Sequence, residues 1–412
     1  KRISNSKSIR FFVAEDCHPQ TIDVLRTRAE PLEFELVIGN LIEQLEQKDD
    51  NFFGALIQYP GTFGDIHDIE QIIKKFKQSG TMVSVSSDPM SLVLLKPPGE
   101  LGADVVFGTA QRFGIPMGFG GPHAAFFASR EKYLRSIPGR IIGASVDRRG
   151  KTALRMALQT REQHIRREKA TSNICTAQAL LAVISSFYAV YHGPEGLKVI
   201  AKRIHRLTSI LVEGLNKLGI PIKNSFFFDN ITLLLGNRRD NYYEIALEKG
   251  INLRKIDSEE LSINIDETSG RSDIKKILSI FSDGKNLPSI DEIDSSIVEG
   301  RTEERIPRKL CRSSEFLKHP IFNKYHSETS MLRYLRFLQD KDIALDRAMI
   351  PLGSCTMKLN ATSEMIPVSW PEFSDIHPFA PPEQTLGYIE VINELENCLI
   401  RITGFDSISM QP

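Results

Sequence analysis

The sequence lacks several features that would assign it to a class at once. Its 412 residues carry 52 lysines and arginines against 52 aspartates and glutamates, so no charge excess favours nucleic acid or an anionic membrane as partner. The five cysteines form no C-x-x-C pair, which argues against a zinc site and a disulfide framework. We therefore expect free thiols, no bound metal and a reducing compartment.

Long apolar runs are also missing. The most apolar stretch, residues 177–190, contains Gln178, Ser185 and Ser186, so it is too polar to span a membrane and predicts a buried helix. The first residues, KRISNSKSIRFF, have neither an initiator methionine nor the apolar core of a signal peptide. We expect the chain to begin inside a longer protein.

Short apolar runs alternate with polar amphipathic stretches over residues 9–128. Six runs are candidate strands: IRFFVAE, FELVIG, GALIQY, MVSVSS, ADVVFG and AAFFAS. A helix is predicted at residues 66–80, where four apolar side chains share one face: Ile69, Ile72, Ile73 and Phe76. This alternation predicts an α/β domain with a mainly parallel sheet, whose ligands would lie at the carboxyl ends of the strands.

The pattern changes further along the chain. The spacing of apolar residues over 177–219 predicts a long connecting helix, and the residues up to 284 alternate strand-like and helix-like stretches, as in a small α+β domain. A polar, charged linker and a helical, proline-rich segment follow. We therefore divide the chain into four parts: residues 1–176, 177–284, 285–314 and 315–412.

Four long stretches, in order along the chain, carry a resemblance to one family. They are GADVVFGTAQRFGIPMGFGGPHAAFFA, TREQHIRREKATSNICTAQ, YHSETSMLRYLRFLQDKDIALDRAMIPLGSCTMKLN and WPEFSDIHPFAPPEQTLGY. Together they resemble the P-protein of the glycine cleavage system, the decarboxylating glycine dehydrogenase. The resemblance implies the aminotransferase-type fold (fold type I) of pyridoxal-phosphate enzymes, with a large α/β domain and a small α+β domain. It also implies that the chain joins part of a lysine-less first half to the opening of a second half, which carries the cofactor lysine.

The resemblance implies an activity for the whole protein. This is the pyridoxal-phosphate-dependent oxidative decarboxylation of glycine, with transfer of the aminomethyl group to the lipoyl group of the H-protein. The implied partners are glycine, the H-protein, the T-protein and the L-protein, with a dimer of paired halves and with neither nucleic acid nor membrane. The expected location is the bacterial cytoplasm, or the mitochondrial matrix in a eukaryote. The alternative hypothesis is a non-catalytic scaffold that completes a partner's active site.

No lysine occurs between Lys96 and Lys132, where the resemblance implies the cofactor-binding lysine. Aligning GADVV and the following IP places that lysine at Gln111 or Arg112. A glutamine amide is not a nucleophile and an arginine stays protonated, so neither residue can attack the cofactor aldehyde. We therefore expect no catalytic residue in this part of the chain.

Asp88 and the glycine loop each have two interpretations. Asp88 follows MVSVSS, where this fold places the carboxylate that pairs with the pyridine nitrogen, but the simpler interpretation is a cap on the next turn. Gly118, Gly120 and Gly121 could surround a phosphate, yet phosphate loops usually open a helix and this loop precedes a strand. A tight turn with positive φ is favoured.

Two later stretches supply the candidate cleft residues. The basic stretch TREQHIRREKATSNIC predicts either an anion-binding rim or a solvated helix face. The stretch PLGSCTMKLN predicts either a loop near the active cleft, as the resemblance implies, or a plain turn. The candidate cofactor-binding residues are His164, Arg167, Ser354, Cys355 and Thr356.

Overall fold

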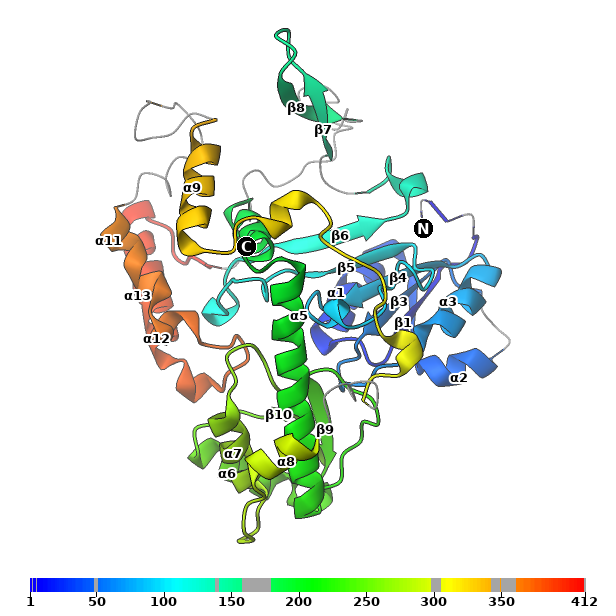
Figure 1. Ribbon diagram of the computed structural model, residues 1–412, viewed down its shortest axis with the longest axis vertical. Helices are drawn as coiled ribbons and strands as arrows, with labels where there is room; N and C mark the ends of the chain where they lie inside the picture. The colour runs from blue at the N-terminus through cyan, green and yellow to red at the C-terminus, as the bar shows by residue number, and fades with distance from the viewer. Residues whose placement is uncertain are drawn as a thin grey trace.

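The computed structural model describes residues 1, 3–4, 6–47, 51–137, 141–157, 179–297, 305–341, 349 and 361–410. A lobe built on a large sheet lies beside a long vertical helix, and a smaller lobe packs at the lower end of that helix (Figure 1). The C-terminal helices run along the opposite side of the long helix from the sheet (Figure 1).

The large sheet contains all six predicted strands. Their order across the sheet is β2-β1-β3-β4-β5-β6, with every neighbouring pair parallel except β5 and β6. The central strand β3 is buried throughout because both faces are covered. The strands are β1 (Arg10–Ala14), β2 (Glu35–Gly39), β3 (Gly54–Tyr59), β4 (Met82–Ser87), β5 (Val105–Thr109) and β6 (Ala125–Ser129).

Three helices pack near the first strands: α1 (Pro19–Ala29), α2 (Leu41–Glu46) and α3 (Ile69–Gln78). The helix α3 confirms the prediction for residues 66–80. Asp68 caps its start by accepting a hydrogen bond from the Glu70 amide at 3.2 Å, and all four predicted apolar residues are buried. Gly80 then turns the chain with φ of 76°.

The predicted connecting helix is α5 (Ala179–Leu218), which bends at Gly193. Only glycine fits there, because its φ is 61° and a Cβ would lie 2.4 Å from the Phe322 carbonyl oxygen. The prediction of burial was wrong for the first turns, where Leu180 is 60% exposed. Those turns precede the point where α5 reaches the sheet, at the 3.2 Å hydrogen bond from Ser185 Oγ to the Ala110 carbonyl.

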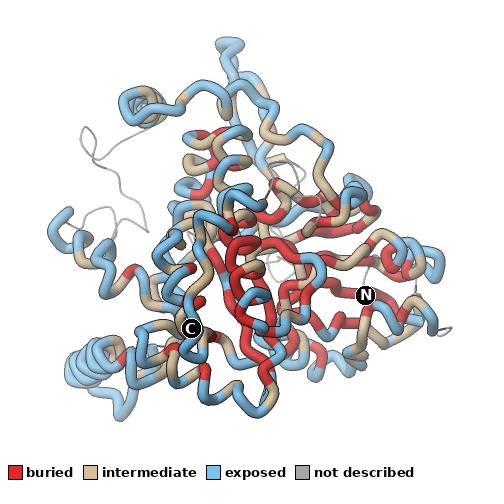
Figure 2. The backbone as a smooth tube through the Cα atoms, turned by 60° about the horizontal axis from the view of Figure 1, so that its bottom comes forward, coloured by how far each residue is buried: buried red, intermediate tan, exposed pale blue. Residues whose placement is uncertain are grey.

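The smaller lobe has the predicted α+β pattern. Its antiparallel sheet has the order β10-β11-β9, and α7 packs against α5, where Gly214 leaves room for the Leu278 side chain. One continuous core links both lobes. Figure 2 shows the buried residues gathered in the interior of the molecule. The elements are β9 (Asn230–Leu234), α6 (Arg239–Glu248), β10 (Arg254–Lys255), β11 (Glu260–Asn264) and α7 (Arg271–Ile280).

A hairpin that the sequence did not predict projects from the body of the molecule (Figure 1). Its antiparallel strands are β7 (Ile141–Val146) and β8 (Thr152–Ala157). Asp147 closes the turn, because its Oδ1 accepts hydrogen bonds from the amides of Arg149 and Lys151 at 2.8 and 2.9 Å.

After the smaller lobe the chain passes through α8 (Ile290–Ser296) and returns to the large lobe. Ile306 and Leu310 are buried there, and the Lys96 amide donates to the Leu310 carbonyl at 2.7 Å. Beyond residue 315 the described residues contain helices but no strand, and neither α9 nor α13 buries a residue. The helices are α9 (Glu328–Gln339), α11 (Thr362–Met365), α12 (Pro371–Ser374) and α13 (Leu386–Thr403).

Within the described parts of the chain, no helix combines the length and apolarity needed to cross a bilayer.

Candidate functional site

Asp88 lies just beyond β4, at the carboxyl edge of the large sheet. Its Oδ1 accepts from the Met90 amide and its Oδ2 from the Ser91 amide, both at 3.0 Å. Asp88 therefore caps the next turn, as the simpler interpretation predicted. The same carboxylate also accepts a hydrogen bond from Arg112 Nη1 at 2.7 Å, so the neighbouring loop supplies its cation.

Arg112 follows β5 and lies at the centre of a cluster of three carboxylates. Besides Asp88, its Nη1 donates to Asp229 Oδ2 at 2.6 Å, and its Nε donates to Glu267 Oε1 at 2.8 Å. The guanidinium carbon also lies 5.7 Å from the centre of the Phe228 ring. Sequence analysis did not find Asp229 and Glu267, because they follow Arg112 by more than a hundred residues and no local pattern marks them.

Burial and charge oppose each other in this cluster. Burial alone would lower the pKa of Arg112, but its three carboxylate neighbours outweigh that effect and hold its pKa well above the ordinary value. Burial raises the pKa of Asp229 to about 6 despite the attraction of Arg112. Arg112 therefore remains a cation with three carboxylates around it.

Gln111 stays within its own loop. Its Nε2 donates to the carbonyls of Pro116 and Met117 at 3.0 and 3.4 Å, which closes the turn that begins the glycine stretch. Of the two residues at the predicted lysine position, only Arg112 reaches the carboxyl edge near Asp88. The equivalence of Gln111 or Arg112 to the lysine stays a prediction.

The glycine loop is a tight turn. Gly118 and Gly120 have φ of 50° and 88°, as predicted, whereas Gly121 has φ of −35°, so the prediction was wrong for this residue. The loop contacts the C-terminal segment rather than a sheet edge. The Phe119 amide donates to the Ile376 carbonyl at 2.8 Å, and its ring stacks on Tyr388 with 4.5 Å between centroids.

The stretches TREQHIRREKATSNIC and PLGSCTMKLN lie outside the described residues, and so do the candidate cofactor-binding residues within them: His164, Arg167, Ser354, Cys355 and Thr356. Their roles remain predictions.

Asp16, two residues beyond β1, is a buried acid that sequence analysis missed. Among the described residues neither of its carboxylate oxygens has a hydrogen-bond partner, and His67 Nε2 lies 3.7 Å from Oδ2. Burial first and the nearby Asp65 second raise its pKa to about 7. Its place directly after a central strand was the only available signal.

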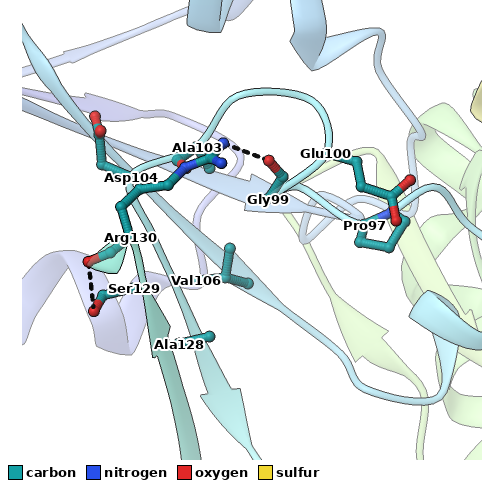
Figure 3. Close-up of a pocket in the computed structure, with 9 residues that line it drawn as sticks. All are labelled: Pro97, Gly99, Glu100, Ala103, Asp104, Val106, Ala128, Ser129 and Arg130. Atoms are coloured by element: carbon teal, nitrogen blue, oxygen red, sulfur yellow. Dashed lines mark hydrogen bonds between the residues drawn. The ribbon is translucent and has the colours of Figure 1, made fainter. Parts of the chain in front are cut away.

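A hollow of about 450 Å³ lies beside the start of β5, whereas Arg112 follows the end of this strand. Figure 3 shows the residues that line the hollow. The Arg130 guanidinium crosses it and donates to the carbonyls of Ala103 and Gly99 at 3.0 and 2.5 Å. Arg130 is the arginine that lines the hollow, and it already binds these two carbonyls. We therefore assign no ligand to the hollow. Its lining residues are Pro97, Gly99, Glu100, Ala103, Asp104, Val106, Ala128, Ser129 and Arg130.

In the part of the chain that the structure describes, no group of three or more histidine, cysteine, aspartate or glutamate side chains is placed to hold a metal ion. The free cysteines there are Cys17, Cys311 and Cys398.

The architecture matches that of a solved pyridoxal-phosphate enzyme of fold type I. The crystal structure of glycine decarboxylase (P-protein) of the glycine cleavage system, in inhibitor-bound form, superposes with a TM-score of 0.58 and 29% sequence identity. The match covers 67% of this chain and 65% of that chain. The predicted fold class, a large α/β domain with a small α+β domain, is confirmed.

The family assignment rests on sequence. The profile of the glycine cleavage system P-protein matches residues 1–281, and the chain belongs to this family. A glycine dehydrogenase (decarboxylating) of Photobacterium profundum is 54% identical over 411 residues, and glycine dehydrogenase (decarboxylating) 2 of Pseudomonas fluorescens is 56% identical over 412 residues. Each comparison covers the whole chain, which spans 42% of the length of either relative.

The residues present at the carboxyl edge do not fit pyridoxal phosphate. The cofactor needs an amine nucleophile, but the stretch between Lys96 and Lys132 has none. It also needs a carboxylate for its ring nitrogen, and Asp88 already accepts from Arg112. This site therefore cannot form the covalent attachment of the cofactor.

Proposed function

We propose that this chain is part of a glycine dehydrogenase (decarboxylating). The whole protein would catalyse the pyridoxal-phosphate-dependent oxidative decarboxylation of glycine and transfer the aminomethyl group to the lipoyl group of the H-protein. Identity of 54–56% along the entire chain to enzymes of that name is the observation that carries this proposal. It favours the enzyme over the scaffold hypothesis.

Within that enzyme, this chain would supply a half without the cofactor lysine. The arginine and three carboxylates at its carboxyl edge support this role, because none of these four side chains is an amine nucleophile and Asp88 already accepts from Arg112. We propose that the lysine belongs to a part of the protein outside residues 1–412. The division into residues 1–176, 177–284, 285–314 and 315–412 would then separate the lysine-less half from the opening of the lysine-bearing half.

The cleft of the whole enzyme would take side chains from two stretches of this chain. Guanidinium groups bind carboxylates and phosphates through paired hydrogen bonds, which suits Arg167 with His164 beside it to an anionic cofactor or substrate. Ser354, Cys355 and Thr356 could add hydroxyl and thiol contacts from a loop.

The family places the protein in the glycine cleavage system. Beyond that, we propose glycine and the lipoylated H-protein as direct partners, the T-protein and L-protein as further members of the system, and a dimer of paired halves. The relatives named above are bacterial, which favours the bacterial cytoplasm over the mitochondrial matrix.

The test is the exchange of labelled carbon dioxide into glycine by the complete protein, with and without H-protein. If Arg167 binds an anion in the cleft, Arg167→Ala should lower exchange by one to two orders of magnitude while the melting temperature stays nearly constant. A loss seen only with H-protein would assign Arg167 to docking instead.

The matched control is Arg26→Ala, which removes an exposed arginine of α1 that pairs with Asp23. It should leave both rates unchanged. Wild-type exchange in Arg167→Ala and His164→Ala would contradict the proposed cleft residues, and an absence of exchange in the wild-type protein would contradict the activity itself.

A further inference from the structure

Arg112 joins two parts of the molecule that lie far apart in the sequence. Asp88 and Arg112 belong to loops of the large lobe that follow β4 and β5. Asp229 directly precedes β9 and Glu267 follows β11, so these two acids belong to the smaller lobe. The four side chains meet where the carboxyl edge of the large sheet faces the smaller lobe.

One nitrogen of Arg112 bridges carboxylates of the two lobes. Arg112 Nη1 donates at 2.7 Å to Asp88 in the large lobe and at 2.6 Å to Asp229 in the smaller lobe. The side chains of Arg112, Asp229 and Glu267 are 19%, 14% and 25% exposed. Such pairs are screened less by water than surface pairs, so their attraction is stronger.

We propose that Arg112 is a structural cation that fixes the smaller lobe to the carboxyl edge of the large sheet, in the place of the cofactor lysine. In a pyridoxal-phosphate enzyme of this fold, the ring nitrogen of the cofactor would give the aspartate its positive partner. Here Arg112 gives Asp88 that positive charge. This inference does not depend on the proposed reaction, because its consequences are measured without turnover.

A guanidinium suits this cluster better than an ammonium group. Arg112 uses Nε for Glu267 and Nη1 for the two aspartates, so its planar fork addresses carboxylates in different directions at once. A lysine would keep the positive charge but has only one nitrogen, at the end of a flexible chain.

Other hydrogen bonds between the two lobes limit the effect that we expect from the loss of Arg112. The loop after β3 binds the smaller lobe separately, through hydrogen bonds from Asn230 Nδ2 and Arg254 Nη1 to the Thr62 carbonyl, both at 3.1 Å. Loss of Arg112 should therefore loosen the lobe on the β4–β5 side without separating the two lobes.

The experiment is backbone hydrogen exchange on the complete protein and its Arg112→Ala variant. The Ile265 amide, which donates to the Asp229 carbonyl at 2.9 Å, reports on the smaller lobe beside the cluster. We expect it to exchange several-fold faster in Arg112→Ala, whereas the β3 amides stay protected. Arg112→Lys should give an intermediate rate, and Arg26→Ala should match the wild type.

Two further experiments distinguish the charge of Arg112 from a role in packing alone. Guanidinium chloride at a non-denaturing concentration should restore slow exchange to Arg112→Ala, because the ion can occupy the vacated cluster, whereas sodium chloride at equal ionic strength should not. Adding Asp229→Asn to Arg112→Ala should also restore part of the protection, because it removes one of the repelling charges.

Exchange in Arg112→Ala equal to that in Arg26→Ala would overturn the proposal. If Arg112→Ala does not fold, the double variant decides: a folded Arg112→Ala/Asp229→Asn protein supports the proposal, and loss of folding in both overturns it.

Discussion

Two acids at the carboxyl edge of the sheet illustrate opposite ways of burying a charge. Asp88 has two backbone amides and a guanidinium as donors. Asp16 lies two residues beyond β1 but has no donor to its side chain among the described residues, and burial raises its pKa to about 7. A carboxylate without hydrogen bonds favours its neutral form, so Asp16 makes the stability of the protein depend on pH near neutrality.

Asp16→Asn should reveal this dependence. The folded-state pKa of about 7 lies above the ordinary value of 3.8, so the folded protein binds a proton that the unfolded chain releases between these two pH values. The wild type should therefore lose stability as pH rises through about 7, by an amount on the order of 1–3 kcal/mol at pH 8.5. Asp16→Asn should remove this loss, which denaturant unfolding at pH 5.5 and 8.5 would measure.

Asp23→Asn is the control for Asp16, since Asp23 is an exposed acid paired with Arg26. Its pH profile should follow the wild type. If Asp16→Asn and the wild type have parallel profiles over this range, Asp16 is not the titrating group.

At this scale the sequence shows that no lysine lies between Lys96 and Lys132, but it does not show the cluster around Arg112. The acids from the smaller lobe, Asp229 and Glu267, come close only because α5 brings that lobe to the sheet edge. Such contacts between distant segments leave no periodic signal.

At the scale of elements, the glycine loop packs against the C-terminal segment, a contact that its sequence did not predict. Its turn places Phe119 on Tyr388, near the start of α13, and leaves Gly120 close to Pro378, where a Cβ would lie 3.1 Å away. A loop shaped like part of a ligand site thus holds the C-terminal segment against the large lobe.

Tyr388→Ala should weaken this attachment. Loss of a stacked aromatic pair costs about 0.5–1.5 kcal/mol beyond the lost buried area, and the effect should be confined to the contact. The Phe119 amide, bonded to the Ile376 carbonyl, should therefore exchange faster with solvent than in the wild type. Tyr388→Phe keeps the ring and loses only the 2.6 Å hydrogen bond to the Phe373 carbonyl, so it should retain most of the protection. Equal exchange in wild type and Tyr388→Ala would exclude the ring contact as the cause.

The elements that sequence analysis found and missed differ in their pattern. The six strands of the large sheet were predicted because buried strands form apolar runs between polar helices. The hairpin β7–β8 was missed because its strands are partly exposed: Ile142, Val146 and Leu154 face solvent among small and polar residues. The spacing of apolar residues predicts a strand poorly when neither face of the strand packs against a core.

On the scale of the whole molecule, burial declines toward the C-terminal end among the described residues. The chain from residue 305 to 317 packs on the large lobe, but α9 and α13 expose large apolar side chains such as Leu332, Phe337 and Ile402. The linker and the final segment were predicted from composition as two separate parts. Among the described residues the linker buries Ile293, Ile306 and Leu310, whereas α9 and α13 of the final segment bury none. Composition cannot show which polar stretch lies against a sheet.

Limited proteolysis of purified residues 1–412 should follow this difference. Cleavage requires local opening, which costs least where few side chains are buried. We expect the first cuts between residues 327 and 410, leaving a resistant product that includes both lobes. Mass spectrometry of the early fragments would locate the cuts, and initial cleavage inside the large sheet would contradict this expectation.

The carboxylates around Arg112 also affect any attempt to restore chemistry by one substitution. Arg112→Lys would supply an amine at the carboxyl edge, but Asp88, Asp229 and Glu267 would surround it. Neighbouring anions favour the ammonium form, which has no lone pair with which to attack an aldehyde. Arg112→Lys would thus place a poor nucleophile in a weakened protein. A reactive amine at this position would require several coordinated changes, among them the loss of acids that hold the two lobes together.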